Sequence, residues 1–179
     1  MKEVRLDEKS ARRIAAGRLE TLKDRIRTGL AGIRPREKPD TRARLLVQHF
    51  QKGYGDWLLW SGRSGRNLVM QLAHPSQPAG WVDIAIVILN LRSNALKIGQ
   101  IARLSAHATA RLLERRRGVD IERLLVEELS EKPLRALTDA AVGHQKVEFE
   151  LPTVNGAFRF DVDEDGGLVA VTWVANKPS

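Results

Sequence analysis

The sequence FRFDVDEDGGLVAVTW, residues 158–173, decides the fold class of this chain. Phe158 and Phe160 alternate with charged residues before the acidic turn 163–167, which ends in two glycines. After the turn, large apolar residues recur at every second position, at 169, 171 and 173. Such alternation is typical of strands with one buried face, and a glycine-containing turn between two of them is typical of a hairpin. The stretch therefore predicts a C-terminal β-hairpin with strands over 156–162 and 168–175, and with Thr172 on the second strand.

Two further apolar segments upstream also predict strands. The run from Ile84 to Leu89, within 81–91, is continuous rather than alternating, which is typical of a strand covered on both faces. Shorter apolar runs flank the segment SGRSGR at 61–66 and predict two strands joined by a glycine loop. Weaker strands are expected at 96–98 and 146–151.

Helical periodicity dominates the N-terminal part of the chain. Residues 7–30 place apolar side chains at helical spacing, with lysines and arginines on the other faces, and glycines at 29 and 32 weaken its end. Asp40 is the expected N-cap of a second helix over 41–52. Each of three later helices begins after a capping residue or with a proline, and they are expected at 106–117, 121–130 and 133–142.

Helices first and an antiparallel sheet towards the end predict an α+β fold, with helices packed on the sheet and a C-terminal β-hairpin. A chain of 179 residues is long enough for one domain with a core and an appended segment. We therefore expect a basic helical N-terminal segment, 1–53, followed by an α+β domain, 54–179.

The distribution of charge indicates a polyanionic partner. The net charge is +8, and residues 1–116 hold 23 Lys and Arg against 10 Asp and Glu, whereas 117–179 hold 7 against 12. A field this asymmetric favours approach to nucleic acid or to an acidic protein. The alternatives are an ordinary solvated surface and acidic membrane headgroups, but the N-terminal helix lacks the aromatic residues usual for membrane insertion.

Several function classes are disfavoured by what the sequence lacks. It has no cysteine, no phosphate-loop or nucleophile-elbow motif, and four scattered histidines, so we expect neither a metal site nor a cofactor. The first residues carry charges where a signal peptide needs apolar ones, and the longest apolar run is too short to cross a bilayer. We therefore expect a cytoplasmic protein without a membrane partner.

The most informative polar pattern is the segment SAHATARLLERRRG at 105–118. His107, Arg111 and Arg115 follow one another at intervals of four and form one row on the predicted helix. Guanidinium groups bind phosphate oxygens bidentately and an imidazole transfers protons near neutral pH, so the row suits a phosphodiester. The structural alternative is that the two arginines pair with carboxylates of the adjoining sheet, namely Glu148, Glu150 or Asp161.

This pattern resembles a motif of known toxins. His107-Ala-x-x-Arg111-Leu-x-x-Arg115, followed by GVDIE at 118–122, is similar to the His-Ala-x-x-Arg-hydrophobic-x-x-Arg-Gly-Ile helix of small bacterial toxin-like domains. These belong to the barnase, EndoU, colicin and RelE-type ribonuclease class. The resemblance covers roughly residues 100–175. It implies helices packed on an antiparallel sheet whose last strand carries a Val-Thr-aromatic element, here 171–173.

The resemblance implies cleavage of RNA by attack of the 2′-hydroxyl on its own phosphate, which leaves a 2′,3′-cyclic phosphate. His107 is then the general base or acid, and Arg111 and Arg115 hold and neutralise the phosphorane. Thr172 donates a hydrogen bond to a phosphate oxygen. A second proton-transfer group is needed, and His144 is the other histidine in the same half of the chain.

Other residues are weaker candidates for nucleic-acid contact. Arg63 and Arg66 lie in the predicted loop 61–66, whose backbone N–H groups are placed to surround a phosphate. Arg116 and Arg117 follow the row on the helix. Three tryptophans either stack on bases or belong to the core, and these are Trp57, Trp60 and Trp81.

These observations define three hypotheses. The first is a metal-independent endoribonuclease of toxin type, with an acidic antitoxin or immunity protein as its inhibitor. The second is a non-catalytic protein that binds nucleic acid, RNA above all, through its basic N-terminal residues 1–66. The third is an adaptor whose basic half binds an acidic protein. The ribonuclease alone requires His107, Arg111 and Arg115 to converge on one concave site.

Overall fold

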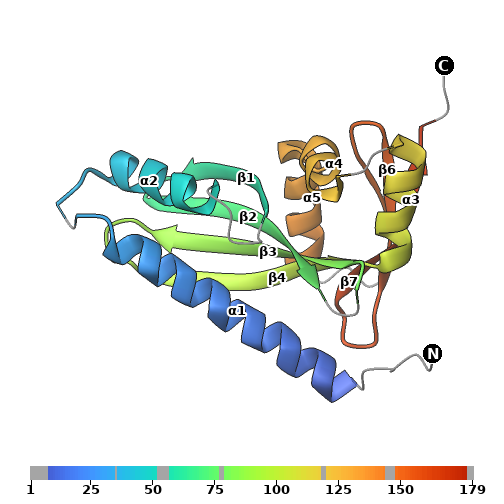
Figure 1. Cartoon of the computed structure of the whole chain (residues 1–179), viewed down its shortest axis with the longest axis horizontal. Coiled ribbons are helices and arrows are strands. Elements are labelled where there is room, and N and C mark those ends of the chain that lie inside the picture. Colours follow the sequence, from blue (N-terminus) through green and yellow to red (C-terminus); the bar gives the residue numbers. More distant parts are fainter. Residues whose placement is uncertain are drawn as a thin grey trace.

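The computed structural model describes residues 8–34, 36–51, 57–76, 79–117, 120–143 and 148–176, with side chains from Glu20 onward. Within these ranges the protein is mixed α and β, with five helices and one curled seven-stranded sheet (Figure 1). The helices are α1 (Glu8–Ala31), α2 (Pro39–Gln51), α3 (Ala106–Arg116), α4 (Ile121–Glu128) and α5 (Glu131–Val142). The strands are β1 (Trp57–Ser64), β2 (Asn67–Ser76), β3 (Trp81–Asn90), β4 (Leu96–Leu104), β5 (Phe149–Pro152), β6 (Gly156–Val162) and β7 (Leu168–Ala175). None of the helices in the described ranges has both the length and the apolar character that crossing a bilayer requires.

The strand order is β1-β2-β3-β4-β7-β6-β5, and one neighbouring pair, β4 with β7, is parallel. The sequence predicted an antiparallel sheet, and the parallel pair of β4 and β7 differs from that prediction. Its origin is the long connection through α3, α4 and α5, after which β5, β6 and β7 return as an antiparallel meander. A parallel neighbour requires such a long crossover, whereas a tight turn yields only antiparallel pairs.

The β1–β2 hairpin and the β6–β7 hairpin differ in their turns. Between β1 and β2 the turn is only Gly65 and Arg66, because Ser61 to Ser64 belong to β1. The predicted six-residue glycine loop is therefore absent. Between β6 and β7, the Asp163 side chain accepts hydrogen bonds from the N–H groups of Asp165 and Gly167, at 3.0 and 2.6 Å. This carboxylate stabilises the acidic turn on which the hairpin prediction rested.

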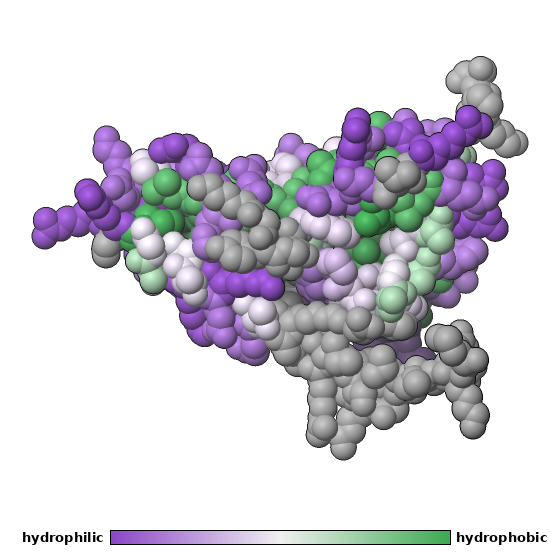
Figure 2. All heavy atoms as spheres, viewed as in Figure 1, coloured by the Kyte–Doolittle hydropathy of each residue, from purple (hydrophilic) through white to green (hydrophobic). Residues whose placement is uncertain are grey.

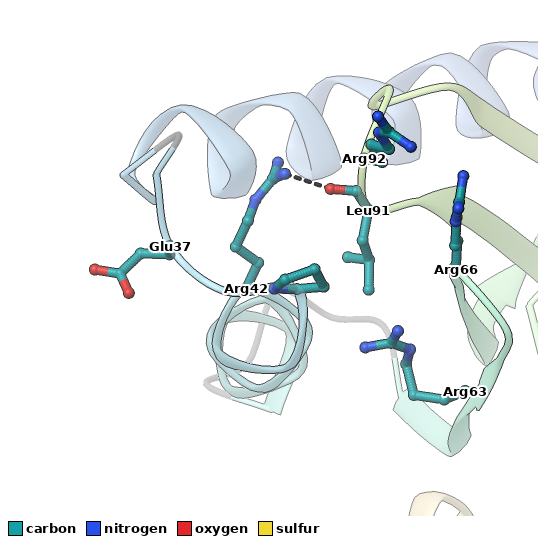
Figure 3. A pocket seen from close by; sticks show the side chains of 7 residues that line it. Glu37, Arg42, Arg63, Arg66, Leu91 and Arg92 are labelled. Atoms are coloured by element: carbon teal, nitrogen blue, oxygen red, sulfur yellow. Dashed lines mark hydrogen bonds between the residues drawn. The ribbon is translucent and has the colours of Figure 1, made fainter.

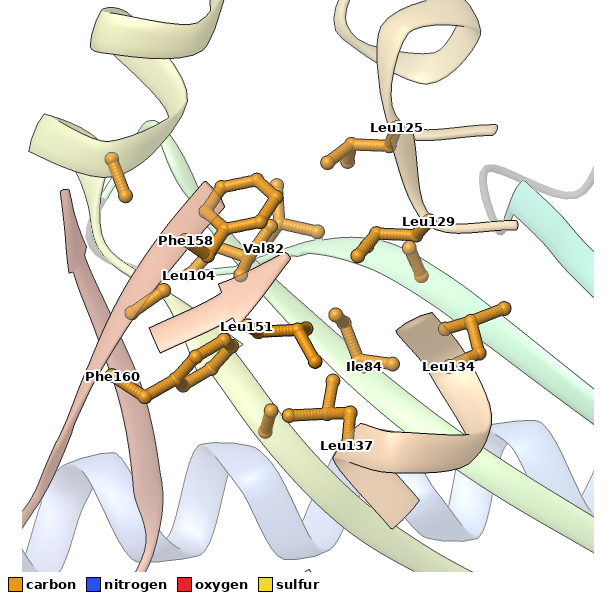
Figure 4. Close-up of a cluster of buried hydrophobic side chains, with 14 of the residues drawn as sticks. Val82, Ile84, Leu104, Leu125, Leu129, Leu134, Leu137, Leu151, Phe158 and Phe160 are labelled. Atoms are coloured by element: carbon orange, nitrogen blue, oxygen red, sulfur yellow. The ribbon is translucent and has the colours of Figure 1, made fainter. Parts of the chain in front are cut away.

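Both faces of β3 are covered, which accounts for its continuous apolar sequence. On one face Val82 and Ile84 contribute to a core with α3, α4, α5 and the β5–β7 strands (Figure 4). On the other face Ala85, Val87 and Leu89 contribute to a second core with α1 and α2. Successive side chains of a strand point to opposite faces, so one strand joins two cores.

The N-terminal helices share this second core with the sheet. Leu22 and Ile26 of α1 and Leu46 of α2 are buried in it with residues of β2 and β3. Helix α1 continues through Gly29, where the sequence predicted a weakening. A Cβ at Gly29 would lie 2.8 Å from the His49 ring and 2.9 Å from Leu46. This glycine therefore permits the close approach of α1 and α2.

Local capping sets the bounds of the helices that follow β4. Ser105 accepts a hydrogen bond from Ala108 N at the start of α3, and Asp120 accepts one from Arg123 N at the start of α4. Helix α3 ends at a left-handed Arg117 with φ of 50°, and Gly118, the predicted terminator, lies outside the described residues. Helix α5 begins two residues before Pro133, because a proline in the first helical turn loses no intrahelical hydrogen bond.

A buried carboxylate joins α4 to the turn before β6. Glu128 is 0 % exposed and accepts hydrogen bonds from Thr153 Oγ1, Asn155 N and Asn155 Nδ2, at 2.6, 3.0 and 2.8 Å. Its Oε1 atom, which accepts from Asn155 Nδ2, also lies 3.1 Å from Arg116 Nε at the end of α3. Since a buried charge is tolerated only when paired and hydrogen-bonded, this cluster sets the relative positions of α3, α4 and β6.

Candidate nucleic-acid interface

The predicted row on α3 exists as one exposed flank of that helix. The His107 and Arg115 side chains are exposed, and Arg115 has no ion pair or hydrogen bond with any residue that the structure describes. Arg111 is half-buried and pairs with Glu114 on its own helix at 2.8 Å. Neither arginine pairs with Glu150, whose partner is Arg159 at 3.4 Å. Of the two arginines in the row, Arg111 is therefore neutralised by Glu114, and Arg115 is available to a ligand.

Thr172 does not join this row. Helix α3 packs through Ala108 and Leu112 onto the core that includes Trp173 of β7. Thr172 precedes Trp173 on the strand, and successive side chains point to opposite faces of the sheet. Its hydroxyl therefore lies on the face away from α3. His144, the suggested second proton-transfer group, lies outside the described residues.

The two remaining arginines at the end of α3 differ in their availability. Arg116 is held between Glu127, at 3.2 Å, and the buried Glu128. A hydrogen bond from Arg123, with a further one from Arg116, holds the pKa of Glu127 below its ordinary value. Arg117 is exposed at the helix terminus. Arg116 is therefore part of the structural cluster, and only Arg117 is presented to a ligand.

Arg63 and Arg66 line a pocket at the other end of the molecule, where α2 lies in Figure 1. The pocket has a volume of about 380 Å³, and Arg42 and Arg92 complete its cationic lining (Figure 3). It forms where the N-terminal end of α2, the β1–β2 turn and the β3–β4 turn meet. Its other lining residues are Glu37, Pro39 and Leu91.

The backbone of Leu91 joins the three segments that form this pocket. Its N–H donates to the carbonyl of Arg66 at 3.0 Å, and its carbonyl accepts from Arg42 Nη1. Arg42 Nη2 also donates to the side chain of Asn94, at 2.5 Å. The Asn90 side chain accepts from the N–H groups of residues 92 and 93 and stabilises the β3–β4 turn. These hydrogen bonds therefore fix the relative positions of the segments that carry the arginines.

The pocket holds fewer carboxylates than arginines. Arg42 is 7 % exposed, has no carboxylate partner among the described residues, and has an Nε without an acceptor. Arg66 and Arg92 are exposed and make no side-chain ion pair within the same described ranges. Arg63 alone is paired, with Asp40 at 2.6 Å. A buried guanidinium without a counter-ion is costly, so this site favours an external anion.

Sequence reasoning identified Arg63 and Arg66 but missed Arg42 and Arg92. Arg42 stands four residues before Leu46 and eight before Phe50, on the inward side of α2. A cation in the apolar stripe of a helix is a signal that can be read from sequence. Arg92 has no such signal, because only the β3–β4 turn brings it to the pocket.

A second buried polar cluster lies on β2, β3 and β4. Asp83 is 2 % exposed and accepts from Ser76 Oγ at 2.7 Å and from Arg103 Nε at 2.8 Å. His74 Nε2 lies 3.7 Å from the same carboxylate. A hydroxyl has one proton to donate, and that of Ser76 goes to Asp83, so this is not a serine nucleophile with a histidine base. The cluster instead joins three strands through one buried charge.

The tryptophans proposed as base-stacking groups have structural contacts. Trp57 and Trp60 are half-buried against the first core, and Trp81 lies 5.6 Å from the guanidinium of Arg103. The arginine-lined pocket, with its buried Arg42, is therefore the candidate phosphate site that we carry forward. No protein-family model matches this chain, and no curated protein or solved structure matches it either.

Proposed function

We propose that this protein binds nucleic acid through its phosphate groups, and that the pocket formed by Arg42, Arg63, Arg66 and Arg92 is the centre of the interface. The observation that carries the proposal is the buried guanidinium of Arg42, which has no carboxylate partner in the described parts of the chain. Guanidinium groups bind phosphate oxygens with strong, directional, charge-assisted hydrogen bonds.

The distribution of charge supports this assignment. The basic residues 1–116 include all four pocket arginines, whereas residues 117–179 are net acidic. Hydrophilic side chains project at the end of the molecule that α2 occupies (Figure 2). A polyanion is therefore attracted to the basic part of the chain, which contains the pocket, and repelled from the acidic part, which orients the complex as it forms.

Binding of single-stranded RNA is expected to weaken steeply with salt, because the arginines displace counterions from phosphates. Replacing two exposed pocket residues, Arg66→Ser with Arg92→Ser, should lower the affinity about 150-fold at low salt, at about 1.5 kcal/mol per charge-assisted contact. The slope of log Kd against log salt should fall by about 1.4. Fluorescence anisotropy across a salt series measures both quantities.

A matched control is available on α5, away from the pocket. The double variant Lys132→Ser with Arg135→Ser removes the same charge from exposed positions. It should leave affinity and slope nearly unchanged. If both double variants reduce binding equally, net charge rather than the pocket is responsible. If the wild-type protein binds no nucleic acid at low salt, the acidic-protein adaptor becomes the better hypothesis.

Metal-independent cleavage of RNA at α3 is the second candidate function. It is favoured by the exposure of His107 and Arg115 on one flank and by the absence of a partner for Arg115 among the described residues. In this proposal the protein is a toxin-type endoribonuclease, inhibited by an acidic antitoxin or immunity protein. Arg111 becomes available when its contact with Glu114 opens, because both side chains are partly solvent-exposed.

A further inference from the structure

We propose that the arginine-lined pocket takes the terminal phosphomonoester of a nucleic-acid strand in preference to an internal phosphodiester. The inference rests on the proposed function and names the ligand group that occupies this site. Three features of the pocket support it: its unbalanced charge, the buried guanidinium of Arg42 with its neutral hydrogen-bond acceptors, and the combination of its size with two apolar lining residues.

The charge of the pocket matches a dianion. Asp40 neutralises Arg63, which leaves Arg42, Arg66 and Arg92 against a single Glu37, a net charge of about +2. The carboxylate of Glu37 points away from the arginines in Figure 3. An internal phosphodiester carries a charge of −1, whereas a phosphomonoester carries about −1.5 to −2 at neutral pH. The terminal group therefore balances the site, and the internal group leaves it cationic.

The guanidinium of Arg42 keeps an uncompensated positive charge beside the pocket, because its donors have neutral acceptors or none. Its Nη1 and Nη2 atoms donate to Leu91 O and Asn94 Oδ1, so Nε is the nitrogen without an acceptor. A phosphomonoester presents three free oxygens and has one attachment to its strand, which can leave towards solvent. A phosphodiester has two free oxygens and two attachments, so its strand must both enter and leave the pocket.

The pocket can also accommodate part of the terminal nucleotide. Its volume of about 380 Å³ falls at the lower end of the range for small-ligand sites. Pro39 and Leu91 contribute apolar groups to the same lining as the arginines, which suits the face of a sugar or base. This arrangement distinguishes a strand end from inorganic phosphate, because the phosphate ion makes no use of the apolar residues.

The experiment compares RNA oligonucleotides of one sequence that carry a 5′-phosphate, a 3′-phosphate or hydroxyls at both ends. Anisotropy at physiological salt should show about tenfold tighter binding for one phosphorylated end than for the hydroxyl form, as expected for an additional charge-assisted contact. The Arg92→Ser variant should lose this preference. The Arg42→Met variant should lose it too, and its melting temperature is measured first to establish that this variant is folded. The control Arg135→Ser should retain the full preference.

Two outcomes overturn the inference. Equal affinity of wild-type protein for all three oligonucleotides leaves backbone binding intact and removes end recognition. Competition by a nucleoside monophosphate, or by inorganic phosphate, at the concentration at which the phosphorylated strand competes shows a site for a free anion instead. If no oligonucleotide binds at any salt concentration, the proposed function itself fails, so the two failures are distinguishable.

Discussion

Replacement of Glu128 by alanine is expected to lower the free energy of unfolding by about 3–5 kcal/mol, the usual result of removing one partner of a buried ion pair. The carboxylate is 0 % exposed and accepts three hydrogen bonds from Thr153 and Asn155. The variant leaves those donors without acceptors and leaves Arg116, only partly exposed, without its buried partner. Both effects destabilise the folded state, because the same groups are hydrated in the unfolded chain.

Urea denaturation of the purified protein measures this change. The control is Glu127→Ala, which removes the neighbouring, more exposed partner of Arg116 and should change the midpoint far less. Glu128→Gln should fall between the two, because it retains one oxygen acceptor and removes the charge. A Glu128→Ala variant that unfolds at the wild-type midpoint, with an unchanged slope, would show that the cluster makes no net contribution to stability.

Replacement of His107 by alanine is expected to lower the rate of RNA cleavage by about 10²–10⁴-fold if α3 carries a ribonuclease site, the usual contribution of a general acid or base. The side chain is exposed, so the melting temperature should not change. Arg115→Lys should also lose most of the activity, since an ammonium group cannot bind phosphate bidentately. Cleavage by the wild-type protein should survive EDTA.

The ion pair between Arg111 and Glu114 makes a further variant informative. Glu114→Gln releases the guanidinium from its 2.8 Å contact, so cleavage should be maintained or increased. Because Glu114 lies on an exposed face of the helix, its replacement by Gln should have little effect on the stability of the protein. His107→Ala protein that cleaves at the wild-type rate excludes this site. RNA binding at the pocket is unaffected by that result, because α2 and α3 lie at opposite ends of the molecule (Figure 1).

The sequence alone was sufficient to predict the turns and helix caps that are held by hydrogen bonds between residues close together in the chain. The Asp163 turn, the Ser105 cap and the Asp120 cap all form hydrogen bonds with residues two to four positions away. The continuous apolar run of β3 likewise indicated, correctly, that both faces of this strand are covered. Such features depend on spacing along the chain, which is visible before folding.

The buried carboxylates show where local sequence became insufficient. Asp83 and Glu128 each interrupt an apolar pattern, and that interruption can be read as unusual. Their partners, however, come from other strands and turns, such as Arg103 for Asp83 and Asn155 for Glu128. Sequence spacing carries no information on which donors the strand register will bring to a buried oxygen.

By itself, the sequence determined the mixed α and β class, the capped starts of α3 and α4, and the concentration of positive charge before residue 117. The expected cap Asp40 instead lies inside α2, which begins at Pro39. Tertiary structure decided which of those charges share a site. Three of the pocket arginines are far apart in the chain, namely Arg42, Arg66 and Arg92. They meet because Leu91, the neighbour of Arg92, hydrogen-bonds the backbone carbonyl of Arg66 and the guanidinium of Arg42. Arg116 was drawn into a structural cluster by Glu128. Charge is a property of composition, but its availability to a ligand depends on which neighbours fold against it.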